Sequence, residues 1–401
     1  MNAAPFTGGR SLLARSAALG LLGLGLTGVG AALDLRRALF SYLAAYTFWV
    51  GIAAAALVFL LANEAAGARW YIVVRRLLET IPSALAVLAV LFLPIALGMK
   101  ELYPWAAPAS APALAGHGAA AAAAHLWEHR HPWLNVPFFL FRTVLYLVVL
   151  LAVGALMRSW SLRQDGSGDP DLTLKMRRLS AGSLPFVALA ITFAAVDWQM
   201  SLSAFVFSTI FGVYWFSGSL VAAIGVLIIA VAAASKEEPL RAALNANHVH
   251  SLGKYLLAFT AFWAYIAFSQ YLLIWIANLP EEVPWYLVRT DSGWKGVGVF
   301  LALFQFVLPF VILLSRPLKR RLGPLVFMSA WVIVAHYVDV YWVVMPPLSP
   351  RGPQPSWMDL AALLGVGGVA VAFVVSRLRG HPLVPARDPN LSDSLGYEPL
   401  Q

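Results

Sequence analysis

Long apolar runs limit this chain to a helical membrane protein. A helix needs about 20 mainly apolar residues to cross a bilayer. The sequence contains ten such runs, near 11–33, 39–62, 80–99, 134–157, 184–206, 208–234, 252–277, 296–315, 323–345 and 358–377. Only 12% of the residues are charged, whereas a soluble domain has about one quarter. We therefore expect an all-α integral membrane protein with about ten transmembrane helices.

The positions of the polar helices indicate an internal duplication. The spans within 39–207 and those within 208–346 start on the same side. Each set closes with a helix whose outer half is polar, "AAVDWQMSL" at 194–202 and "AHYVDVYWVVMPP" at 335–347. Parallel repeats of this kind occur in membrane transport proteins. We expect two four-helix bundles, 39–207 and 208–346, flanked by a first helix with its connection (1–38) and by a last helix with a tail (347–401).

The basic residues predict the orientation of the helices. Most of the 28 lysine and arginine residues fall on the side that holds both termini, among them Arg75, Arg76 and Arg158. Because positively charged loops stay in the cytoplasm, both termini are expected there. The same topology explains the formal net charge of +9, so nucleic acid is not an expected partner.

The absence of cysteine limits the redox centres that this chain can hold. Iron–sulfur clusters, thiolate zinc sites and covalently attached haem c all need cysteine sulfur. A haem b inside a bundle usually takes two histidines, and only His336 falls within a predicted span. In the outer loop, His125, Glu128, His129 and His131 have a spacing that could hold zinc if the loop were helical. Without a strict motif we favour a solvated loop there.

Three ionisable residues within the predicted spans are candidates for chemistry. A charged side chain at the centre of a bilayer costs about 2.5 to 3.5 kcal/mol on insertion scales, so Asp197, His336 and Asp339 should face a bundle interior. His336 and Asp339 share a helix face, and Tyr337 and Tyr341 form an adjacent hydroxyl row. Such a line can pass protons. We therefore interpret these five residues as parts of a proton pathway.

Other polar groups could extend this pathway towards the outer surface. On neighbouring spans they are Tyr214, Ser217, Tyr265, Ser269 and Gln270. A hydrogen bond between helices explains any single one of them more simply. At the outer end of 252–277, Asn278 and Pro280 break the helix, and Glu281 and Glu282 follow. These two carboxylates either mark an ordinary helix end, or guard a proton exit or dock a partner.

Four segments carry a resemblance to a known family. They are "HSLGKYLLAFTAFWAYIAFSQYLLIWIANLPEEVPWY" at 250–286, "HYVDVYWVVMP" at 336–346, "DWQMSL" at 197–202 and "HPLVPARDPNLSDSLGYEP" at 381–399. Together they resemble the F-type membrane subunits of alternative complex III, a bacterial quinol:cytochrome c oxidoreductase. These subunits belong to the NrfD, or polysulfide reductase membrane subunit, superfamily.

The resemblance implies a multi-pass subunit of the bacterial inner membrane, within a complex that oxidises menaquinol or ubiquinol. The implied partners are lipids, a membrane C subunit, an iron–sulfur B subunit, haem c subunits and possibly a terminal oxidase, so the cofactors would sit on other chains.

The paralogous C subunit is implied to handle quinol with a histidine and an aspartate in its first bundle. Here 80–99 and 134–157 lack histidine, and Asp197 alone remains. We therefore expect a subunit without its own redox centre or catalytic residues, which scaffolds the complex and conducts protons. The alternatives are a quinol-binding subunit of the same complex and a stand-alone secondary transporter.

Overall fold

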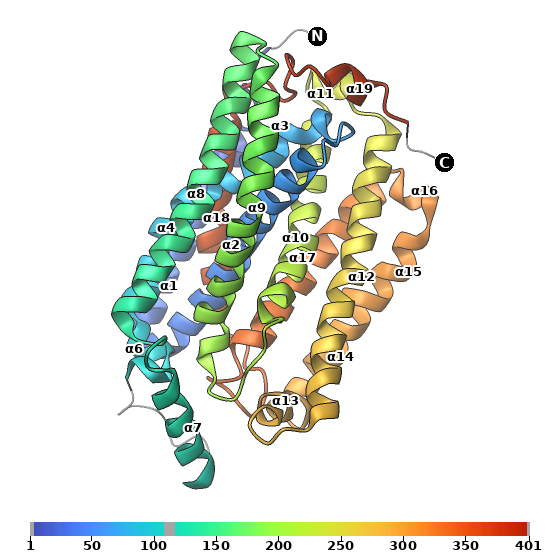
Figure 1. The fold of residues 1–401 in the computed structure, drawn as a ribbon. Helices are drawn as coiled ribbons and strands as arrows, with labels where there is room; N and C mark the ends of the chain where they lie inside the picture. Colours follow the sequence, from blue (N-terminus) through green and yellow to red (C-terminus); the bar gives the residue numbers. More distant parts are fainter. Residues whose placement is uncertain (1–3, 108–116, 399–401) are drawn as a thin grey trace.

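The computed structural model describes residues 4–107 and 117–398, and all regular structure within these ranges is helical. Ten of the helical segments described are long and apolar enough to cross a membrane. They lie side by side in one bundle, and both chain ends lie at the same end of it (Figure 1). The expected fold class, an all-α membrane protein, is confirmed.

The ten candidate spans follow the sequence in order. They are α1 (Arg10–Leu33), α2 (Leu35–Ala65), α3 to α5 (Ile72–Leu97), α8 (Val136–Ser167), α9 with a 3-10 turn (Asp171–Leu202), α10 (Phe211–Ala234), α12 (Ala246–Ala277), α14 to α15 (Trp294–Leu314), α17 (Leu322–Val344) and α18 (Trp357–Leu378). Shorter helices lie between them or in the tail: α6 (Met99–Leu102), α7 (His117–Arg130), α11 (Leu240–Ala243), α13 (Val283–Thr290), α16 (Arg316–Lys319) and α19 (Leu391–Leu395). Helices α7 and α13 lie at the end of the bundle opposite the termini (Figure 1).

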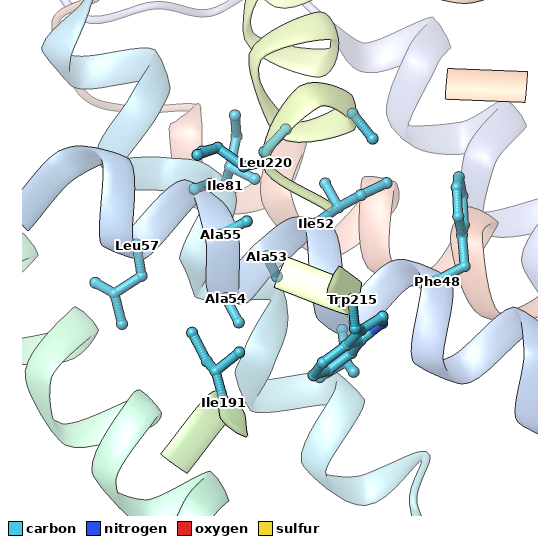
Figure 2. Close-up of a cluster of buried hydrophobic side chains, with 14 of the residues drawn as sticks. Phe48, Ile52, Ala53, Ala54, Ala55, Leu57, Ile81, Ile191, Trp215 and Leu220 are labelled. Atoms are coloured by element: carbon cyan, nitrogen blue, oxygen red, sulfur yellow. The ribbon is translucent and has the colours of Figure 1, made fainter. Parts of the chain in front are cut away.

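Helix α2 forms the centre of the bundle. Almost all its side chains are buried, and it packs against α9, α10, α17 and α18. Figure 2 shows the small side chains at 53–55 beside Ile191 of α9 and Trp215 and Leu220 of α10. Small residues allow helices to approach closely in a bilayer, where packing rather than the hydrophobic effect holds them together. One core therefore joins helices of both predicted bundles, and the parallel repeat stays a prediction.

The two flanking helices, α1 and α18, pack against each other along a stripe of small residues. A Cβ atom at Gly20 would lie 2.6 Å from the backbone nitrogen of Val369, and one at Gly23 would overlap Gly365. The remaining surface of α1 is mostly exposed and apolar, including Leu21 and Leu22. Glycine is thus needed on one face of α1, whereas its other face suits lipid.

Several helices are longer than the sequence predicted. The third span begins at Ile72 rather than near 80, because the charged residues of α3 are buried in ion pairs within the fold. Helix α12 begins at Ala246 rather than near 252, where Asn245 and His248 form a reciprocal capping box. Helices α8 and α9 extend beyond their predicted cytoplasmic ends, so only residues 168–170 connect them.

The tail after α18 covers the end of the bundle where both termini lie. The backbone of Phe6 pairs with Gly380 and His381 at 2.9 Å in both hydrogen bonds. Ser394 of α19 bonds the backbone of Trp70, and its own carbonyl lies 2.9 Å from Nε2 of His248. The tail is therefore an integral part of the fold.

Candidate functional site

Asp339 is the centre of a buried polar cluster between α10, α12 and α17. The Tyr214 hydroxyl donates a short hydrogen bond to Oδ1 of Asp339, and the Trp263 indole donates to Oδ2 at 3.1 Å. Nδ1 of His336 lies 3.5 Å from Oδ2, and Nε2 of the same ring lies 3.3 Å from the Ser219 hydroxyl. All five side chains are buried. Tyr214, Asp339, His336 and Ser219 thus lie in one buried polar line, in which His336 and Asp339 approach each other without a hydrogen bond.

Packing holds the His336 ring in this line. A Cβ atom at Gly218 would lie 2.6 Å from Nδ1 of His336, so the imidazole lies directly against the backbone of α10. Phe48 of α2 packs on the ring, with 5.6 Å between the ring centroids. An imidazole can both accept and donate a proton. Proton transfer between Asp339 and His336 needs a small shift of the ring, because Nδ1 has no hydrogen-bond partner among the described groups.

Tyr337 and Tyr341 lie next to each other, as the predicted row requires, and their hydroxyls contact a different cluster from that of Asp339. The Tyr337 hydroxyl donates to the backbone oxygen of Asp359 at 3.3 Å, and Arg37 lies 3.5 Å from the Tyr341 hydroxyl. Arg37 pairs with the Asp359 carboxylate at 2.5 Å, and Ser41 donates to it at 2.6 Å. Adjacent residues of a helix point about 100° apart, so Tyr337 cannot share the face of His336. The two tyrosines contact α2 and α18 instead.

Asp197 lies in a third cluster, locked by an arginine. Arg142 forms a bidentate pair with this carboxylate, through Nε at 2.8 Å and Nη2 at 2.9 Å. Tyr146 and Trp133 donate further hydrogen bonds to it, at 2.9 Å and 3.1 Å. Arg142 was not singled out from the sequence, and this pair was missed. The signal that could have found it is the rule that charges buried in a membrane usually pair, since Arg142 falls within a predicted span.

The remaining predicted residues lie apart from the Asp339 cluster. Gln270 is buried and accepts a hydrogen bond from Ser208 at 3.4 Å. Tyr265 is 65% exposed on the apolar outside of α12, which places it away from any internal route. Asn278 ends α12 in a left-handed conformation with φ of 47°. Glu281 is exposed, and Glu282 is partly exposed.

Two cavities meet at Arg289 of α13, a residue that the sequence reasoning did not single out. One, of about 470 Å³, lies between α12, α13, α14 and α17, and Tyr214 and Trp263 line it. The other, of about 460 Å³, lies under α7 and α13 and is lined by Arg36 and several prolines. Arg289 has only 3% of its surface exposed. Burial lowers its pKa to about 9.

A network of ion pairs lies at the opposite end of the bundle. Arg75 pairs with Asp388 of the tail and with Glu64 at 3.3 Å, and Arg76 pairs with Glu79 and Asp165. Both arginines are at most 1% exposed. From the sequence, both arginines were interpreted as charged residues of a cytoplasmic loop. In the structure they join α2, α3, α8 and the tail.

The outer histidines do not form a metal site with other side chains that the structure describes. The rings of His125 and His129 lie edge to face on α7, 4.4 Å apart between centroids. Within 4–107 and 117–398, no group of three or more histidine, aspartate or glutamate side chains is arranged to hold a metal ion.

No model of a known protein family matches the chain, and no curated protein is significantly similar to it in sequence. Fold, site geometry and the resemblance of individual segments are thus the basis for a functional proposal.

Proposed function

We propose that this chain is an integral membrane subunit of a respiratory quinol:cytochrome c oxidoreductase, or of one with another high-potential acceptor, related to alternative complex III. In this proposal it holds no redox centre, scaffolds the complex and conducts protons. The observation that carries the proton role is the buried line of Tyr214, Asp339, His336 and Ser219. The resemblance of 250–286, 336–346 and the tail supports membership of the complex.

The partners of Asp339 suit proton exchange better than those of the other buried carboxylates. Asp197, Asp359 and Asp388 each pair with an arginine, whose guanidinium keeps its proton. Asp339 instead contacts a phenol, an indole and an imidazole. None of these partners carries the fixed positive charge of a guanidinium, so Asp339 is not held in an ion pair with an arginine.

The quinol-binding alternative is less well supported in the first bundle. A quinol site there would need an apolar pocket that ends at Asp197. Arg142, Tyr146 and Trp133 already occupy both oxygens of that carboxylate. Asp197 lines neither of the two cavities described. We therefore place quinol oxidation, haem c and the iron–sulfur clusters on partner chains of this inner-membrane complex.

Purification of the tagged full-length chain in a mild detergent tests membership of the complex. We expect it to copurify with haem c and iron–sulfur subunits in fixed proportion, because no cysteine is present to hold such centres in this chain. Haem absorbance and mass spectrometry of the purified material measure this. Isolation as a stable monomer that transports a substrate in liposomes would instead support the secondary transporter.

A further inference from the structure

Within the part of the chain that the structure describes, Arg289 is a buried cation without a charged partner. Its Nη1 and Nη2 donate to the backbone oxygens of Trp285 and Val343, at 2.8 Å and 3.0 Å, and its Nε has no hydrogen-bond partner. The guanidinium lies 3.6 Å from the Trp285 ring centroid and 5.0 Å from that of Trp342. Among the side chains that the structure describes, no carboxylate lies within 4.0 Å of it.

The contacts of Arg289 do not balance the positive charge of its guanidinium. Carbonyl oxygens and aromatic faces supply partial negative charge, but they do not neutralise a guanidinium. An uncompensated charge removed from water costs several kcal/mol. Near this end, the buried Arg142 and the partly buried Arg37 each meet a carboxylate. Arg289 is therefore expected to meet an anion that comes from outside this chain.

The cavity of about 470 Å³ shows which kind of anion fits. Its wall is almost wholly apolar, and exposed side chains of the bundle surface form part of it, among them Phe268 of α12 and Val299 of α14. Thr290 and Lys295 line it together with Arg289. Polar and cationic groups thus gather where α13 meets α14, while an apolar channel opens between two membrane-facing helices.

We propose that this cavity binds an anionic phospholipid, with its phosphate against Arg289 and one acyl chain along α12 and α14. A free phosphate would leave the apolar wall unfilled. A neutral quinone ring would leave the charge of Arg289 unpaired. A lipid phosphodiester supplies both the charge and the chain. The cavity wall includes Tyr214 of the proton line, but the proposal rests on Arg289 and the apolar wall and does not depend on the proposed function.

Native mass spectrometry of the purified full-length chain, with any subunits that copurify, tests the charged half of the site. After removal of loosely held lipid, the wild type should bind added phosphatidylglycerol at least tenfold more tightly than phosphatidylcholine. Arg289→Met should abolish this preference. Arg351→Met is the matched control at the same end of the bundle, because Arg351 is exposed, and should keep it.

A second variant tests the apolar half without changing any charge. Ala267 lines the cavity, so Ala267→Trp should reduce phosphatidylglycerol binding at least tenfold. Ala277→Trp, on the exposed end of the same helix, should not reduce it. Equal binding of the two lipids by the wild type would overturn the proposal. So would equal binding of inorganic phosphate, or binding of a short-chain quinone that phosphatidylglycerol does not displace.

Discussion

The buried aspartates of this protein differ in the groups that they contact. Asp197 and Asp359 are each fixed by an arginine, and these pairs join helices. Among the described side chains no arginine pairs with Asp339, which instead lies 3.5 Å from Nδ1 of His336, and Nε2 of that ring lies near Ser219. A change at Asp339 should therefore affect proton movement, whereas a change at Asp197 should affect stability.

Substitution of the proton line should lower activity without loss of assembly. Asp339→Asn and His336→Phe remove the groups that exchange protons but keep similar volumes, so the complex should assemble. We expect quinol:cytochrome c turnover, or proton release in liposomes, to fall at least several-fold. Asp291→Asn, at an exposed position, is the matched control. Wild-type values in both assays would show that these residues are structural contacts only.

The Arg142–Asp197 pair should behave as a structural lock. Asp197→Leu leaves the Arg142 guanidinium buried without an anionic partner, which costs about 3 to 5 kcal/mol in comparable ion pairs. The double variant Arg142→Leu with Asp197→Leu should recover a large part of this loss. Denaturation in detergent measures both, as a double-mutant cycle. Normal stability of Asp197→Leu, with reduced proton release, would instead make Asp197 part of the pathway.

Glu281 and Glu282 should tolerate loss of charge if they only follow a helix end. Both lie beyond Asn278, which by itself ends α12. Exposed charges contribute little to stability. The variant with Gln at both positions should thus keep wild-type turnover and assembly. Loss of a copurifying subunit would favour partner docking, and slow turnover in an intact complex would favour a proton exit.

At the scale of the helices, the contact between α1 and α18 depends on glycine. Gly23 lies against Gly365, whereas a Cβ at Gly25 would meet no atom within 4 Å. Gly23→Leu should therefore separate α1 from α18 and lower the thermal denaturation temperature. Gly25→Leu should leave that temperature unchanged. Equal effects of the two substitutions would contradict this account of the packing.

The sequence predicted the helices better than their ends or their charged contacts. Hydropathy alone located every span, because a bilayer requires long apolar segments. It could not extend the third span to Ile72, since Arg75 and Arg76 resemble loop charges until their partners are known. Asp388, the tail partner of Arg75, is more than 300 positions away. Contacts at such separation depend on tertiary structure.

Only part of the candidate site could be predicted, again because contacts between residues distant in sequence depend on tertiary structure. The i and i+3 spacing correctly placed His336 beside Asp339, because helix geometry fixes this relation. The spacing could not show that the Tyr337 and Tyr341 hydroxyls contact Asp359 and Arg37, because those residues lie on other helices. The sequence did not mark Arg289 as a site residue, because an arginine between two spans is expected to be exposed, and only the structure shows that it is buried.

At the scale of the whole molecule, the two ends of the bundle have different chemistry. The end with the termini is held by buried ion pairs between α2, α3, α8 and the tail. The opposite end holds the proton line, two cavities and an unpaired Arg289. The proton and lipid roles proposed for this chain therefore both fall at one end of the bundle, whereas ion pairs join the helices to the tail at the other end.

Quinol-dependent reduction of cytochrome c by membranes tests the central claim most directly. Deletion of the gene for this chain in the source organism should abolish most of the quinol-dependent cytochrome c reduction that remains after the contribution of other quinol-oxidising enzymes is subtracted. Expression of the wild-type chain should restore it, and expression of the Asp339→Asn chain should restore assembly with little activity. Unchanged activity in membranes that lack this chain would contradict its proposed role as a subunit of the quinol-oxidising complex.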